Sequence, residues 1–189
     1  MRSPRPEAPN LGARIRQGWR RFNEPLAAGR DEWVADQAAH LAPGSRVLDV
    51  GAGPCRYRPL FAHCSYAAQD FAQHVGSTEG PLADRGRWQY GALDYVCDAT
   101  AIPVPDASFD VVLCTEVIEH VPQPEGVVRE AARILRPGGL LLLTAPLGSG
   151  LHQEPDHYFG GFTPHWYRRF LAAAGFEAVD ITPNGGFFS

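Results

Sequence analysis

The sequence has no hydrophobic stretch long enough to cross a membrane. Its unbroken apolar runs, such as Leu140–Leu143, are far shorter than the roughly 20 residues that a membrane helix needs. No basic N-terminal end precedes an apolar block, which argues against a secretory signal. We therefore expect a cytoplasmic protein without a membrane partner. The 189 residues, 44% of them hydrophobic, suffice for one ordinary folded domain.

Lysine is absent, so all 17 basic residues are arginines. They are unevenly distributed, because residues 1–30 carry an excess of arginine while the rest of the chain is clearly acidic. Phosphate neutralisation needs clustered cations, and an acidic body offers a poor surface for nucleic acid. We therefore expect no nucleic-acid partner, and we interpret the basic N-terminal arm as a solvated terminus.

Paired cysteine motifs are also lacking. The four cysteines are Cys55, Cys64, Cys97 and Cys114, and none forms a C-x-x-C pair. Cys97 and Cys114 lie in apolar, strand-like segments, where a free cysteine behaves as a small hydrophobic residue. This usage argues against a zinc or disulfide framework and fits a reducing compartment.

Strand and helix patterns alternate along the chain. The expected helices cover 11–41 (interrupted at Pro25), 125–135 and 164–174, and the expected strands cover 46–50, 65–69, 95–97, 109–115, 140–145 and 177–182. The central strands are continuous apolar runs, which is typical of a parallel sheet covered on both faces. The pattern predicts an α/β fold, a doubly wound, Rossmann-like and mostly parallel sheet with helices on both faces. We assign residues 1–40 to a helical arm or lid and 41–189 to the ligand-binding domain.

Acidic residues recur where the predicted strands end. Asp49, Asp70, Asp98 and Glu116 each lie at or near such an end. In doubly wound sheets, ligands bind beyond the C-terminal strand ends. One acid could be a helix cap or a turn residue, but four at equivalent places predict an acidic binding rim.

The glycine-containing turn after the first expected strand, 46–50, indicates which kind of nucleotide ligand would bind. Gly51 and Gly53 resemble a nucleotide-binding loop, but Arg56 stands where G-x-G-x-x-G has its third glycine. Asp70 follows Asp49 at the distance expected for an acid that holds ribose hydroxyls. Asp49 would repel the pyrophosphate of a dinucleotide, whereas the ammonium and sulfonium of S-adenosylmethionine would be attracted to an acidic rim.

These segments together resemble the class I S-adenosylmethionine-dependent methyltransferases. The resemblance covers about residues 40–182, with the motifs in the family's order. The matching segments are Val47–Gly53, Gln69–Phe71, Asp98–Pro103, Phe109–Val112, Glu116–Val121 and Ala132–Gly139. Cys55 departs from the pattern, because the family commonly has a third glycine there.

The resemblance implies a role for each matching residue. Asp49 would lie near the methionine amino group, Asp70 would hold the ribose hydroxyls, and Asp98 would accept from the adenine amino group. Ile102 would pack near the adenine. The implied set of S-adenosylmethionine-binding residues is Asp49, Gly51, Ala52, Gly53, Asp70, Phe71, Asp98, Ala99, Thr115 and Glu116.

The catalytic step is expected to involve the long segment that follows the fifth strand. Methyl transfer is an in-line displacement, in which positioning supplies most of the rate, although an oxygen or nitrogen acceptor can also need a base. His152 or His157 is our candidate base, with ordinary loop histidines and, less favoured, His120 as alternatives. The spacing of His152, Asp156 and His157 matches no standard ligand pattern, so we expect no metal site.

The composition of this segment indicates the kind of acceptor. We expect a small molecule methylated on oxygen or nitrogen, because the segment combines histidine and aromatic side chains. Phe159, Phe162 and Trp166 flank it, whereas Trp19, Phe22 and Trp33 fit core contacts better than a substrate lid. The alternatives are a non-catalytic S-adenosylmethionine-binding scaffold of the same fold and, less favoured, a nicotinamide-dependent oxidoreductase.

The length also carries an expectation. The family's sheet usually has a seventh, antiparallel strand, and the chain ends soon after the sixth expected strand. We therefore expect an incomplete sheet that lacks this strand, from a fragment or a naturally short chain. A homo-oligomer could cover the exposed sheet edge.

Overall fold

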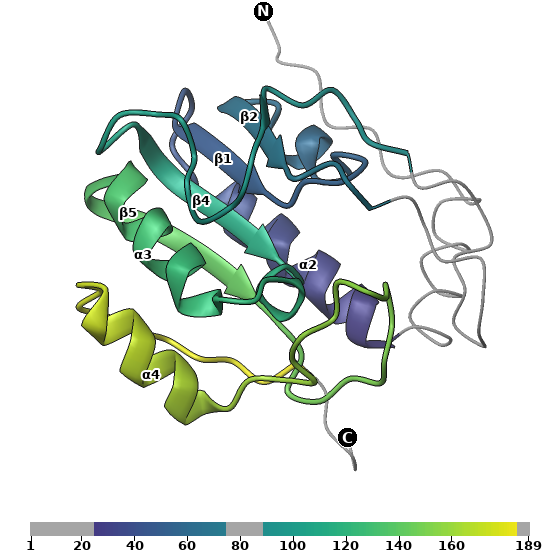
Figure 1. Ribbon diagram of the computed structural model, residues 1–189. Coiled ribbons are helices and arrows are strands. Elements are labelled where there is room, and N and C mark those ends of the chain that lie inside the picture. Colours follow the sequence, from purple (N-terminus) through teal and green to yellow (C-terminus); the bar gives the residue numbers. More distant parts are fainter. Residues whose placement is uncertain (1–24, 75–88, 185–189) are drawn as a thin grey trace, which may run out of the picture. The chain divides into compact units, whose positions relative to one another are not determined.

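The computed structural model describes residues 25–74 and 89–184 (Figure 1). The chain divides into two compact units, one formed by residues 1–37 and 182–189 and the other by residues 38–181. The second unit contains the sheet and all the residues expected to bind a ligand. No helix in the described ranges is both long and apolar enough to cross a membrane.

A five-stranded sheet forms the centre of this unit. Its strands are β1 (Arg46–Val50), β2 (Ser65–Asp70), β3 (Tyr95–Val96), β4 (Phe109–Thr115) and β5 (Leu135–Thr144). They lie in the order β3-β2-β1-β4-β5, and all four pairings are parallel. The order reverses between β1 and β4, as in doubly wound folds. The predicted Rossmann-like class is confirmed.

Burial follows from the position of each strand in the sheet. Val47, Leu48 and Val50 of β1 are buried, as are Val112 and Leu113 of β4. These two strands occupy the interior of the sheet, where a parallel strand needs apolar side chains on both faces. The continuous apolar runs that predicted central strands therefore correspond to the observed core.

Each α-helix in the described part of the chain begins at a proline. They are α2 (Pro25–Ala39), α3 (Pro124–Ile134) and α4 (Pro164–Ala173), and two short 3-10 turns are η1 (Arg58–Phe61) and η2 (Ile118–His120). Proline suits the first helical turn, because the missing N–H has no partner there anyway. The Thr163 hydroxyl caps α4 by accepting from the Trp166 N–H. The part of the expected helix over 11–24, with Trp19 and Phe22, lies outside the described residues.

The apolar face of α3 packs against the sheet. Val127, Ala131 and Ile134 lie in the core cluster with residues of β1 and β4, and α3 contacts β5. In Figure 1, α3 lies in front of β4 and β5.

Two strand predictions need correction. The expected sixth strand over 177–182 is wrong, because these residues carry no regular structure and pair with no strand. Their alternating pattern fits one face of a sheet, but a strand also needs a ladder partner. β5 begins before the expected Leu140, although its regular pairing with β4 starts only there, after a register shift. All strand pairings in the described ranges are parallel.

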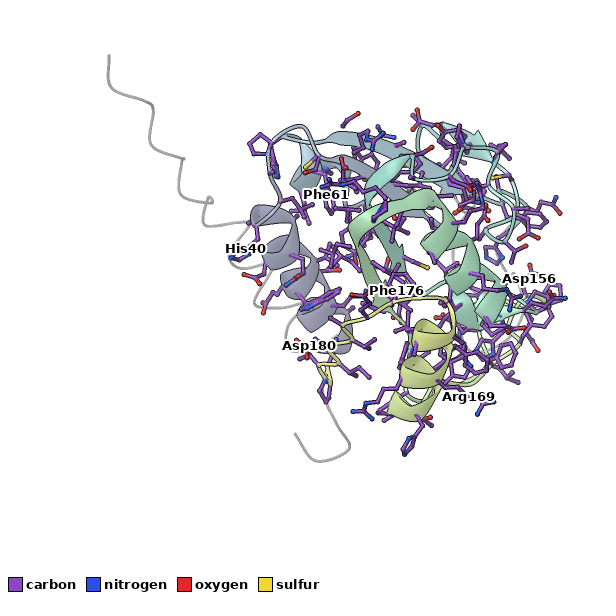
Figure 2. All side chains as sticks on the ribbon, turned by 90° about the vertical axis from the view of Figure 1, so that its left-hand side faces the viewer. His40, Phe61, Asp156, Arg169, Phe176 and Asp180 are labelled. Carbon is purple, nitrogen blue, oxygen red and sulfur yellow. The ribbon has the colours of Figure 1, made fainter. Side chains whose placement is uncertain are left out.

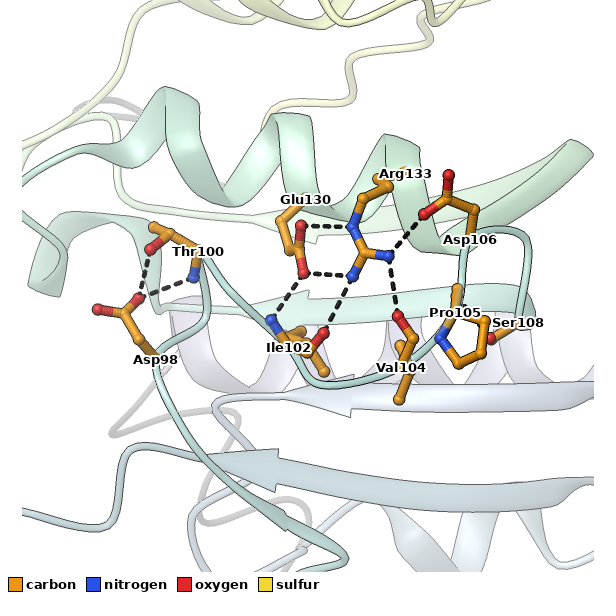
Figure 3. A network of polar contacts seen from close by, with 9 residues as sticks. All are labelled: Asp98, Thr100, Ile102, Val104, Pro105, Asp106, Ser108, Glu130 and Arg133. Carbon is orange, nitrogen blue, oxygen red and sulfur yellow. Dashed lines mark hydrogen bonds and ion pairs between the residues drawn. The ribbon is translucent and has the colours of Figure 1, made fainter.

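A polar network joins α3 to the loop between β3 and β4 (Figure 3). The buried Glu130 carboxylate accepts from the Ile102 N–H at 2.7 Å and from two nitrogens of Arg133 at 2.7 and 2.9 Å. Arg133 also donates to the carbonyls of Ile102 and Val104 and to Asp106. A single guanidinium therefore satisfies both loop carbonyls and the buried acid.

Removing Arg133 should destabilise the protein. Arg133→Ala leaves the Glu130 carboxylate buried without its cation, so we expect the free energy of unfolding to fall by about 2–3 kcal/mol. Asp106→Ala is the matched control, because Asp106 is 79% exposed and its ion pair is worth at most about 1 kcal/mol. Urea unfolding of both variants measures this, and equal losses would contradict a central role for Arg133.

Candidate active site

The C-terminal ends of four strands meet at one edge of the sheet. Asp49 lies opposite Ala68 of β2 and Leu113 of β4, so the residues that follow these strands emerge at the same level. Figure 1 shows the arrowheads of β4 and β5 pointing toward the loop of residues 145–163. The predicted acidic rim therefore forms, with the reversal of strand order at its centre.

Two glycines of the loop after β1 have a left-handed backbone conformation. Gly51 and Gly53 have φ angles of +68° and +50°. A Cβ on Gly51 would lie 2.3 Å from Cγ2 of Val117, so both conformation and space require glycine. Cys55, which stands where the resembling family commonly has glycine, also has a positive φ of 55°.

Asp70 and Gln69, at the end of β2, hold the glycine loop in place. Asp70 accepts from the backbone N–H groups of Gly53 and Ala72, both at 2.9 Å. The buried Gln69 amide donates to the Cys97 carbonyl at 2.6 Å and accepts from the Gly51 N–H at 3.3 Å. The structural role of Gln69 was missed by the sequence reasoning, because it depends on a contact with another strand.

Asp49 is almost completely buried at the end of β1, with 1% of its surface exposed. Oδ2 accepts a short hydrogen bond from the Tyr66 hydroxyl, whereas Oδ1 has no hydrogen-bond partner in the described part of the chain. Burial raises the pKa of the Asp49 carboxyl to about 7, against the opposing effect of the Tyr66 hydrogen bond. Asp49 is therefore an acid whose charge changes near neutral pH.

The remaining predicted ligand residues lie around these two acids. Asp98 is exposed and accepts from the N–H and hydroxyl of Thr100, while Ala99 packs in the core. Phe71, next to Asp70, is 52% exposed, which leaves its ring available for contact.

Glu116 closes the rim after β4. It has a φ of +54°, and its N–H donates to the Thr144 carbonyl at 2.9 Å. Its Oε1 accepts from the Thr144 hydroxyl at 3.0 Å, which ties the end of β4 to the end of β5. Thr115 is the last residue of β4 and is partly buried.

Three histidines meet beside this rim. The ring centroids of His152 and His157 are 4.4 Å apart, and those of His120 and His152 are 4.9 Å apart. Burial lowers the pKa of His120 to about 4 and also lowers that of His157. The structure thus brings both candidate bases together with His120, which the sequence analysis favoured less.

The loop of residues 145–163 carries His152 and His157, and we call it the histidine loop. Backbone hydrogen bonds hold it against η2. The N–H groups of Tyr158 and Phe159 donate to the Glu119 carbonyl at 2.9 and 3.2 Å. Asp156 of the same loop is labelled at the right-hand side of Figure 2. The loop therefore has a defined position relative to the end of β4.

Aromatic residues at the end of the loop and in α4 pack against one another and the core. Phe162 is buried in the core and contacts Phe159 and Trp166, with ring centroids 5.7 and 4.7 Å away. These contacts attach the loop and α4 to the sheet.

Comparison with known proteins shows which family this chain is similar to. The sequence profile of the methyltransferase domain matches residues 48–143. An uncharacterized methyltransferase of Mycobacteroides abscessus is 34% identical over 152 residues, covering 74% of this chain and 56% of that protein. The chain thus spans little more than half the length of this relative.

Two further proteins are similar to the chain. A sarcosine/dimethylglycine N-methyltransferase of Halorhodospira halochloris is 33% identical over 172 residues, covering 82% of this chain and 61% of that protein. The structure of Haemonchus contortus phosphoethanolamine N-methyltransferase 2 in complex with S-adenosyl-L-methionine is 18% identical, with a TM-score of 0.53. The structural match covers 77% of this chain and 36% of that chain. Because the sequence identity is only 18%, the match supports the fold alone.

Substituting Gly51 should damage the glycine loop. Gly51→Ala combines a left-handed conformation with a clash against Val117, so we expect a loss of at least about 2 kcal/mol in the free energy of unfolding. Gly44→Ala is the matched control, since Gly44 has a φ of +80° but no atom within 4 Å of the added Cβ. Its loss should be about 1 kcal/mol. Similar losses in urea unfolding would show that the Val117 contact is unimportant.

Proposed function

Because the chain belongs to the class I S-adenosylmethionine-dependent methyltransferase family, we propose that it catalyses a methyl transfer. The chain uses S-adenosylmethionine as methyl donor and a small molecule as acceptor. The methyl carbon leaves the sulfonium sulfur and bonds to an oxygen or nitrogen of the acceptor, and S-adenosylhomocysteine is released.

One observation carries the proposal: Asp49 is buried at the rim, and its Oδ1 has no hydrogen-bond partner among the described residues. A buried acid normally has every oxygen hydrogen-bonded, so the unused Oδ1 favours a ligand with a donor group. The methionine ammonium is such a donor, and its positive charge would favour the ionised form of Asp49. A pyrophosphate would be repelled instead, which disfavours a nicotinamide dinucleotide.

The other rim residues fit the rest of S-adenosylmethionine. Asp70 would accept from the ribose hydroxyls, and Asp98 from the adenine amino group. Phe71 is exposed beside Asp70 and offers an aromatic face to the adenine. Gly51 and Gly53 leave room for a ligand close to the backbone.

The histidine loop supplies the acceptor side of the reaction. An in-line displacement at the sulfonium needs the acceptor atom held on the axis of the breaking bond. His152 or His157 would take the proton that the acceptor loses. The similarity to a sarcosine/dimethylglycine N-methyltransferase supports a small acceptor with a nucleophilic oxygen or nitrogen. A protein that binds S-adenosylmethionine but transfers no methyl group to any acceptor in a broad panel would fit the scaffold alternative instead.

Binding of S-adenosylmethionine should depend on Asp70. Asp70→Asn removes the charge that would hold the ribose, so we expect the affinity measured by calorimetric titration to fall about tenfold or more. Asp180→Asn, at an exposed position after α4, is the control and should bind as the unaltered chain does. Failure of the unaltered chain to bind S-adenosylmethionine at all would overturn the proposal.

Binding should also strengthen with rising pH. Asp49 holds a proton below a pKa of about 7, and only its ionised form attracts the ligand's ammonium. Between pH 6 and pH 7.5 that ammonium stays largely protonated, so affinity should rise by up to about tenfold per pH unit as Asp49 loses its proton. Asp49→Asn should bind more weakly at pH 7.5 and lose most of this pH dependence. An equally steep rise in the variant would assign the titration to another group.

A further inference from the structure

Two segments far apart in the chain bring a carboxylate and imidazoles together. Glu119 and His120 lie in η2, directly after the rim residue Glu116, and His152 lies in the loop after β5. One ligand-type atom from each of Glu119, His120 and His152 lies within 4.8 Å of the other two. The backbone bonds from Tyr158 and Phe159 to the Glu119 carbonyl hold the two segments in contact.

The hydrogen bonds of the two histidines determine which nitrogen is available. His120 Nδ1 lies 2.8 Å from the Asp156 carbonyl oxygen, and His152 Nδ1 lies 2.9 Å from the Gly150 carbonyl oxygen. A carbonyl can only accept, so each Nδ1 carries the proton and each Nε2 presents a lone pair. This is the usual arrangement around a metal-binding histidine, whose second nitrogen donates to a carbonyl or carboxylate.

We propose that Glu119, His120 and His152 bind a divalent transition-metal ion. Glu119 is 1% exposed, and its Oε1 lies 3.9 Å from His120 Nε2. Two imidazoles and one carboxylate suit zinc, cobalt or iron better than magnesium or calcium, which prefer oxygen ligands. The ligand atoms would have to close by about an ångström around an ion with bonds of about 2.1 Å. A rotation of the loop residue His152 can provide this movement.

His157 lies beside this set without belonging to it. Its ring contacts that of His152, and its Nε2 lies 3.2 Å from the Ser149 hydroxyl. With His152 committed to the ion, His157 is the histidine that remains to act as base. The metal site therefore separates the two candidate bases into one ligand and one proton acceptor.

The role of the ion rests on the proposed methyl transfer. Three protein ligands leave coordination positions open for an acceptor oxygen. The ion lowers the pKa of a bound acceptor hydroxyl, His157 takes its proton, and the oxygen displaces S-adenosylhomocysteine from the methyl carbon. The acceptor class is thereby narrowed to molecules that bind the ion through an oxygen.

Titration with cobalt tests the site directly. The untagged, metal-free chain of residues 1–189 is titrated with CoCl2 by calorimetry, with the visible absorption of bound Co2+ as a second readout. We expect one Co2+ per chain. His152→Ala removes a proposed metal ligand. Because loss of a residue that only hydrogen-bonds to a ligand already lowers metal affinity 10- to 100-fold, we expect the affinity of His152→Ala for Co2+ to fall about 100-fold or more. Glu119→Gln replaces the proposed carboxylate ligand by a neutral amide side chain of nearly the same shape, and it tests this second ligand.

Two histidine controls and a folding check complete the experiment. His165→Ala, exposed on α4, should bind Co2+ as the unaltered chain does. His157→Ala should retain Co2+ affinity within a few-fold. If His152→Ala fails to fold by circular dichroism, His152→Asn replaces it. No Co2+ binding by the unaltered chain, or unchanged binding when His152 is replaced, overturns the site.

S-adenosylmethionine binding, measured on the same samples, separates the two proposals. A chain that binds S-adenosylmethionine but no Co2+ refutes the metal site alone. A chain that binds Co2+ but no S-adenosylmethionine refutes the methyl transfer and leaves the metal site standing.

Discussion

The parallel pairing of β1 with β2 and β4 is the constraint on which the candidate site depends. Each pairing sets the level at which a strand ends, so Asp49, Asp70 and Glu116 emerge at one rim. The same register brings Gln69 within reach of both the glycine loop and the Cys97 carbonyl. A slip of one residue along β1 would turn Asp49 to the other face of the sheet and leave the rim without its central acid.

The rim concentrates negative charge in a partly buried place, and this has an energetic cost. Asp49 meets that cost by holding its proton up to near neutral pH and by accepting from Tyr66, while Asp70 accepts from two backbone N–H groups. A cationic ligand would relieve the repulsion between the two acids, which an anionic ligand would increase. The electrostatics of the rim therefore favour a cationic ligand over an anionic one.

Local patterns predicted most of the fold and the glycine loop, but not the contacts between distant segments. Gly51 and Asp70 could be found because their chemistry depends on spacing within one strand–loop–strand unit. The bond from Tyr66 to Asp49 and the meeting of His120 with His152 depend on how separate strands and loops pack. The error over 177–182 has the same origin, since alternation describes a strand's faces but not whether a neighbouring strand is available.

The sequence by itself determined the parallel α/β fold, the glycine turn after β1 and the acids at or near the ends of several strands. These features arise from the chemistry of residues that are close in the chain. The tertiary structure alone decided that Asp49 is buried with one oxygen unused and that three histidines lie together beside Glu119. Burial and proximity depend on which side chains the fold places around a group, and those neighbours come from segments that are not adjacent in the sequence.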